Sequence, residues 1–257
     1  MKAEPATCTK SKLALALSIV ALSLVPFSIM YGYSVVVIPI QSVLAPHNPY
    51  ALKNSHAVWA LSGSLVMSGV AQYLGGGATR RAPKSALLVS AVGGAIGLIL
   101  QGVAMDLAEH HRRAAIALYY VGQVAFFGPV CGATFLLALI ASLGWLGKLY
   151  PHWPGLGSGA VGPFLALETA VTVWVFWALN DRVGRGALCD KPCTEGRVDI
   201  FFYVAAAVVL GSLLGAAALW DLPAAPAPAK ETRGRGRRCP SEPSRGRGPS
   251  GATSLFI

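Results

Sequence analysis

Charged residues are scarce in this chain of 257 residues. Only 12% of them are Asp, Glu, Lys or Arg, whereas 54% are hydrophobic. Soluble domains usually carry about 25% charged residues, so this chain has too few polar side chains to cover the surface of a globular domain. The composition argues against a soluble enzyme and favours a membrane protein.

Groups suited to catalysis or metal binding are also sparse. The chain has five cysteines and five histidines, and the closest cysteine pair is Cys189 and Cys193. No second pair completes a set of four metal ligands, while a disulfide between these two is chemically permitted outside the cell. No cluster of His, Asp and Ser suggests a catalytic site. We therefore predict no enzymatic activity, no metal and no cofactor.

What the chain does have is a series of long apolar runs between its few charged clusters. A helix needs about 20 apolar residues to cross roughly 30 Å of hydrocarbon, and it satisfies its own backbone hydrogen bonds there. The sequence therefore predicts an all-α membrane protein with a six-helix transmembrane bundle. The predicted spans are residues 13–40, 57–77, 85–105, 114–142, 158–179 and 200–220.

The predicted organisation has three parts. Residues 1–12 form an N-terminal segment, and residues 13–220 form the transmembrane domain. The first apolar run is far longer than the core of a signal peptide, about 7–15 residues, so we predict a retained helix. Residues 221–257 alternate Pro with Ala and then repeat Arg-Gly pairs, which predicts a disordered tail. Attachment to anionic headgroups is an alternative role for this tail, whereas its lack of interleaved aromatics argues against nucleic-acid binding.

The distribution of Lys and Arg predicts the orientation of the chain. Six spans place both ends on one side of the membrane, and basic loops favour the cytoplasm. The N-terminus, the turn with Arg80 and Arg81, and the tail are more basic than the loops on the opposite side. We therefore predict that both termini are cytoplasmic.

Small residues recur four positions apart within the predicted spans. That spacing places both residues on one helix face, where two backbones can approach closely. We predict that these faces form tight contacts between helices. The pairs are Ser64 with Ser68, Gly93 with Gly97, Gly128 with Gly132, Ser158 with Gly162, and Gly211 with Gly215.

Glu168 is the only acidic or basic residue in the middle of a predicted span. Burying its charge costs several kcal/mol unless the group is protonated, paired or hydrated. Two alternatives follow: a proton-coupling site, or a neutral, hydrogen-bonded Glu near one edge of its helix. Softer candidates, which can line a polar cavity or serve packing alone, are Tyr31, Tyr33, Gln101, Tyr119 and Gln123.

Three passages are similar to one family of transporters. The first helix ends in YGYSVVVIPIQ (residues 31–41), the turn after the second helix reads LGGGATRRAPK (74–84), and the turn after the fourth reads LYPHWPGLGSG (149–159). In order and spacing these passages resemble the N-terminal six-helix half of the major facilitator superfamily. The oxalate/formate antiporter-like and monocarboxylate-transporter-like branches are the most similar.

The resemblance implies a role for the turn after the second helix. This turn is the family's signature gating loop, and the residues of this chain that match it are Gly76, Arg80, Arg81 and Lys84. The chain departs from the family pattern at Arg80, where the family has an acid that helps to latch one conformation. It also departs at Pro83, where the family has a glycine.

The resemblance further implies transport of a small organic solute, for example a monocarboxylate, across the lipid bilayer. Such transporters rock two six-helix halves around a midplane site, and this sequence matches one half. Either two copies form a homodimer, a partner supplies the second half, or the chain is a truncated product. The alternative from another class is a non-transporting six-helix protein that binds or regulates a partner.

Overall fold

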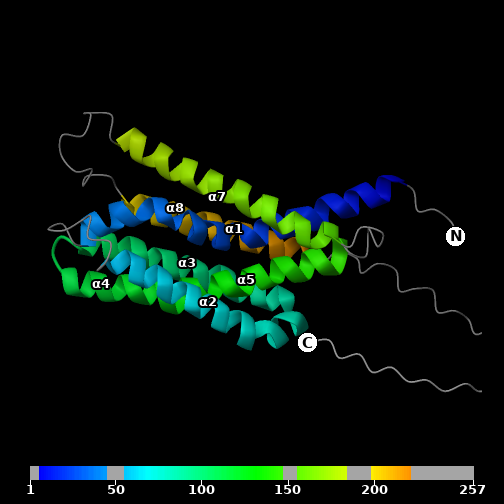
Figure 1. The fold of residues 1–257 in the computed structure, drawn as a ribbon, viewed down its shortest axis with the longest axis horizontal. Helices are drawn as coiled ribbons and strands as arrows, with labels where there is room; N and C mark the ends of the chain where they lie inside the picture. Colours follow the sequence, from blue (N-terminus) through cyan, green and yellow to red (C-terminus); the bar gives the residue numbers. More distant parts are fainter. Residues whose placement is uncertain (1–5, 45–54, 147–154, 184–197, 221–257) are drawn as a thin grey trace, which may run out of the picture. The chain divides into compact units, whose positions relative to one another are not determined.

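The computed structural model describes residues 6–44, 55–146, 155–183 and 198–220, which are almost entirely helical and contain no strand (Figure 1). The predicted tail, the loop with Cys189 and Cys193, and most of the 149–159 turn lie outside these residues. The fourth span consists of four consecutive helical segments, which we call span 4. The elements are α1 (Ala6–Leu44), α2 (His56–Arg81), α3 (Pro83–Leu107), span 4 with α4 (Arg112–Tyr120), η2 (Val121–Phe127), α5 (Gly128–Ala141) and η3 (Ser142–Leu146), then α7 (Gly155–Val183) and α8 (Val198–Leu219).

Five stretches of described helix are long and apolar enough to cross a membrane. They are Leu13–Tyr33, His56–Arg81, Pro83–Leu107, Arg112–Trp145 and Val198–Leu219. The remaining helix, α7, contains a shorter apolar stretch, Val161–Phe176. The predicted all-α class with several helices long and apolar enough to span a bilayer is confirmed, and of the six predicted spans five reach this length while the one in α7 is shorter. Large apolar side chains on the outer surface, such as Val66 and Trp174, suit contact with lipid.

The turn between α2 and α3 is shorter than the sequence predicts. α2 continues through its glycines to Arg81, and Ala82 alone separates it from α3, which begins at Pro83. Pro is favoured at the first helical position because its missing N–H has no helical partner there. Arg80 and Arg81 occupy the last turn of α2, where positive charge interacts favourably with the helix dipole. The predicted gating loop is therefore helical on both sides of one residue.

Helices that are distant in sequence form the main contacts of the bundle. α3 packs most extensively against α8, α2 packs against α5, and α1 packs against α5 and α7. In addition, η2 and α4 pack on α3, and α1 contacts α8. The helices run along a common direction (Figure 1).

These contacts obey an exchange rule between the first three spans and the last three. In this rule α1 corresponds to span 4, α2 to α7 and α3 to α8. The contact of α1 with α7 then corresponds to the contact of span 4 with α2, and both are present. In the same way, the contact of α3 with span 4 corresponds to the contact of α8 with α1. The α1–span 4 and α3–α8 contacts each join two corresponding helices, so the exchange leaves them unchanged. Because each group contains three consecutive helices, alternation of direction makes the second group run opposite to the first. Such a pattern is typical of inverted repeats.

Two of the small-residue pairs face each other across the α2–α5 contact. A Cβ built on Gly132 would overlap the backbone carbonyl of Ser68, and one on Gly128 would lie 2.8 Å from Ser64 O. Gly97 of α3 meets Gly122 of η2 in the same way, since a Cβ on Gly122 would lie 2.6 Å from Gly97 O. The predicted close approach of helix backbones is confirmed at these positions.

The same prediction is wrong at other pairs. A Cβ added to Gly162 or Gly211 meets no atom within 4 Å, and one added to Gly215 meets only Leu22 Cδ1, at 3.5 Å. These glycines lie on faces that no described helix covers closely. Spacing by four residues therefore does not identify the partner of such a contact, and Gly122 makes one without a small residue four positions away.

Candidate functional site

Polar side chains gather in the core where α1, α2, α3 and span 4 meet. We call this group the polar core. Met30 and Tyr33 lie three residues apart on α1, and Tyr119 and Gln123 lie four apart in span 4, so each pair shares one helix face. Every member is at most 2% exposed. The polar core consists of Met30, Tyr33, Ser64, Gln101, Tyr119 and Gln123.

At one level of the polar core, three side chains form a hydrogen-bonded chain. Gln101 Nε2 donates to Gly97 O at 3.3 Å, which turns Gln101 Oε1 toward Tyr33, and the Tyr33 hydroxyl donates to this oxygen at 3.2 Å. The hydroxyls of Tyr33 and Tyr119 are also hydrogen-bonded. Because the Tyr33 proton is used on Gln101, Tyr119 must be the donor to Tyr33.

One helical turn away, Gln123 occupies the second level. Its Nε2 donates to Ser64 Oγ at 3.2 Å, and Ser64 Oγ donates to Leu61 O at 2.8 Å. Met30 Sδ lies 3.7 Å from the same hydroxyl. Gln123 Oε1 is buried and has no hydrogen-bond partner among the described residues. An unpaired buried acceptor costs about 1–3 kcal/mol.

Gln123 lies in the π-helical segment η2, where the Gly128 N–H bonds to Gln123 O, five residues back. The cause is Pro129, which lacks the N–H that would bond Ala125 O and whose ring would clash with that carbonyl in a regular α-helix. A π-helical turn widens the helix and relieves this clash. Such segments are frequent at functional sites.

Four of the five predicted cavity residues come together in the polar core: Tyr33, Gln101, Tyr119 and Gln123. They bond to one another and to the backbone or to Ser64. Tyr31 lies elsewhere, because two residues along a helix turn the side chain by about 200°. It is 55% exposed, with its ring 5.0 Å from Phe27. Sequence reasoning treated Ser64 as a packing residue only and did not single out Met30.

Glu168 is separate from the polar core. It lies on α7, half-buried, beside the Ser28 hydroxyl of α1, whose proton is donated to Val25 O at 2.7 Å and whose oxygen can accept from a protonated carboxyl group. Its Oε2 atom is buried without a hydrogen-bond partner among the described residues. An unpaired carboxylate inside a membrane is costly in its charged form, so this position suits a group that gains and loses a proton.

The predicted gating residues lie far from the polar core. Arg80 follows Ser64 by sixteen helical residues in α2, which corresponds to about 24 Å along the helix axis. Arg80, Arg81 and Lys84 are exposed. Gly76 faces Leu136 of α5, whose Cδ2 would lie 3.7 Å from an added Cβ. These residues can act on the polar core only through movement of α2 against α5.

Polar contacts also tie the opposite end of the bundle together. Arg112 Nε, at the start of span 4, donates to Leu44 O at 2.6 Å, the last residue of α1. Tyr203 of α8 donates to Asp106 Oδ2 of α3 at 2.7 Å. These contacts join α1 to span 4 and α3 to α8, the two pairs that the exchange rule leaves unchanged. The sequence did not reveal either contact.

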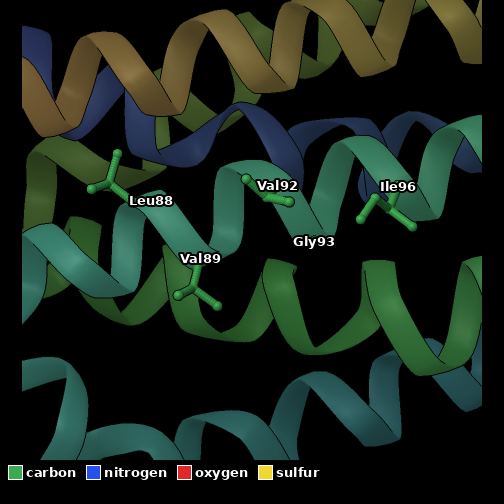
Figure 2. Close-up of a pocket in the computed structure, with 5 residues that line it drawn as sticks. All are labelled: Leu88, Val89, Val92, Gly93 and Ile96. Atoms are coloured by element: carbon green, nitrogen blue, oxygen red, sulfur yellow. The ribbon is translucent and has the colours of Figure 1, made fainter.

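A shallow groove of about 490 Å³ runs along the outer face of α3 (Figure 2). Leu88, Val89, Val92, Gly93 and Ile96 line it. It offers no polar group that could orient a polar ligand, and its position on a membrane-spanning helix suits lipid acyl chains. It is not a candidate for solute binding.

We searched protein-family models, curated proteins and solved structures for similarity to this chain, and none of the three comparisons found a match.

The hydrogen-bond chain makes a prediction about the two tyrosines of the polar core. Tyr33 both donates to Gln101 and accepts from Tyr119, whereas Tyr119 only donates to Tyr33. Tyr33→Phe should therefore lower the free energy of unfolding by about 2 kcal/mol, and Tyr119→Phe by about 1 kcal/mol. Thermal unfolding of the detergent-solubilised variants measures both. Equal losses, or full additivity in the double variant, would contradict this direction of the bonds.

Proposed function

We propose that the chain is a facilitator-type transport protein, or one half of such a transporter, and that it moves a small organic solute across the membrane. The observation that carries the proposal is the exchange rule among the helix contacts. Two groups of three spans, packed in equivalent pairs with opposite direction, are the building plan of many secondary transporters. Together with the sequence resemblance, this pattern favours transport by the major facilitator mechanism.

The polar core supports the same proposal. Polar groups inside a membrane are costly and commonly mark solute or ion pathways. In the proposal, separation of α1 from span 4 releases the hydroxyls of Tyr33 and Tyr119 and the amides of Gln101 and Gln123 to a solute. Tyr31 lies on the opposite, exposed face of α1 and is no part of this solute site. A monocarboxylate, bound in its protonated and uncharged form because the polar core offers no counter-charge, is the first solute class to test.

Transport would require a second six-helix half. We propose that a second copy of this chain, or a partner of the same fold, supplies it. Glu168 would bind the coupling proton, and the segment with Gly76, Arg80, Arg81 and Lys84 would control movement of α2. The excess of Lys and Arg at the ends of the chain supports cytoplasmic termini.

Flux measurements on the purified protein test the proposal. Reconstituted in lipid vesicles, it should take up labelled small organic solutes with saturation, at rates well above those of protein-free vesicles. The Gly211→Ala variant, which places a methyl group in open space, is the control for handling and should retain full flux. Absence of flux, combined with tight co-purification of another membrane protein, would contradict transport and favour a partner-binding role.

A further inference from the structure

The side-chain amide of Gln123 has two hydrogen-bonding ends but only one protein partner. Nε2 donates to Ser64 Oγ, while Oε1 is buried without a partner among the described residues. Rotating the amide by 180° would still leave one buried amide atom of Gln123 without a hydrogen-bond partner. Oε1 could then accept from Ser64 only if that hydroxyl left Leu61 O, and Nε2 would become the buried atom without a partner.

The neighbouring donors of the polar core are already in use. Tyr119 lies one turn from Gln123 on the same face of span 4, but its proton is bound by Tyr33. Gln101 Nε2 is bound by Gly97 O. A buried polar group that its own protein leaves unpaired commonly has a water molecule or a ligand as its partner.

We infer that a small molecule with an uncharged O–H group binds Gln123 Oε1 inside the polar core. The oxygen is an acceptor, so the ligand must donate a proton to it. The partner that the structure gives such a hydroxyl is Gln123 Oε1 itself, a buried acceptor without a hydrogen bond among the described residues. Water and the hydroxyl group of a solute both have this chemistry.

The surroundings exclude charged ligands. The buried polar side chains of the described residues include no Lys, Arg or His, and the polar core has no carboxylate. An anion or a cation placed there would lose its hydration without gaining a counter-charge. An uncharged donor loses less on entry, because it carries no charge to dehydrate and its hydrogen bond to Gln123 Oε1 replaces one that it made to water.

Paired substitutions test the inference, with Gln101 as the matched control. Both amide ends of Gln101 are bonded within the protein, so Gln101→Met should lower the unfolding midpoint by about 3–6 °C. If Gln123 is equally satisfied by a bound hydroxyl, Gln123→Met should lower it by a similar amount. If Gln123→Met is neutral or raises the midpoint while Gln101→Met lowers it, the oxygen has no ligand and the inference is overturned.

A second measurement identifies the source of the hydroxyl. Unfolding midpoints of the wild type and of Gln123→Met are compared in increasing 1,2-propanediol and, separately, in increasing sodium acetate at pH 8. A larger rise for the wild type in the diol shows that a solute hydroxyl enters, whereas equal shifts show that water is the occupant. A larger rise for the wild type in acetate would overturn the exclusion of anions. These readouts do not depend on transport, so they can fail or succeed independently of the flux measurements.

Discussion

Gly132→Val should lower the free energy of unfolding by about 3 kcal/mol or prevent folding altogether. The added side chain would overlap the backbone carbonyl of Ser68, and no flexible side chain lies between that could move aside. α2 and α5 would have to separate, which would also disturb the neighbouring contact of Gly128 with Ser64. Overpacking a close contact costs about 1–3 kcal/mol, and more when backbone must move.

The measurement is thermal unfolding in detergent, combined with the elution profile on size-exclusion chromatography. Gly211→Val is the matched control, because it introduces the same side chain into an apolar helix at a position with no atom within 4 Å. It should change the free energy of unfolding by less than about 0.5 kcal/mol. Equal behaviour of the two variants would show that α2 and α5 do not meet at Gly132.

The comparison of these glycines also shows where sequence reasoning stops. Gly132 and Gly211 each belong to a pair of small residues four apart, so the local pattern predicts the same role for both. The difference lies in the helix opposite, which is distant in sequence and which no local pattern specifies. The spans themselves were predictable, since residues 85–105 and the observed Pro83–Leu107 both reflect one constraint, the thickness of the hydrocarbon layer.

The polar core shows a similar limit. Polarity within an apolar run was enough to select Tyr33, Gln101, Tyr119 and Gln123 as candidates. It was not enough to separate them from Tyr31, because the face of α1 that turns inward depends on the packing of other helices. Tyr33 and Gln101, for instance, are 68 residues apart in the chain.

The π-helical segment had a visible signal that was not used. Pro129 within a predicted span indicates that a regular α-helical hydrogen bond is missing. The sequence cannot say whether a kink or a wider turn results, since both relieve the same clash. The neighbouring contact of Gly97 with Gly122, which is made between two spans, leaves no room for a larger side chain at this level.

Glu168→Gln should reduce solute uptake driven by an imposed pH gradient by at least about tenfold. Gln keeps the size of the side chain and can still bond to Ser28, but it cannot bind and release a proton. Because Glu168 lies apart from the polar core, exchange of solute at equal pH on both sides should remain unchanged. This combination distinguishes loss of proton coupling from loss of the solute site.

Uptake into vesicles with and without the gradient provides the measurement, and Glu109→Gln provides the control. Glu109 is an exposed acid close to the end of α3, so its substitution removes the same charge without touching the interior of the bundle and should leave gradient-driven uptake intact. If Glu168→Gln also leaves it intact, the carboxyl group does not carry the proton. Its burial against α1 would then mean that Glu168 is a neutral, hydrogen-bonded side chain, held by the contact with Ser28 at the α1–α7 interface.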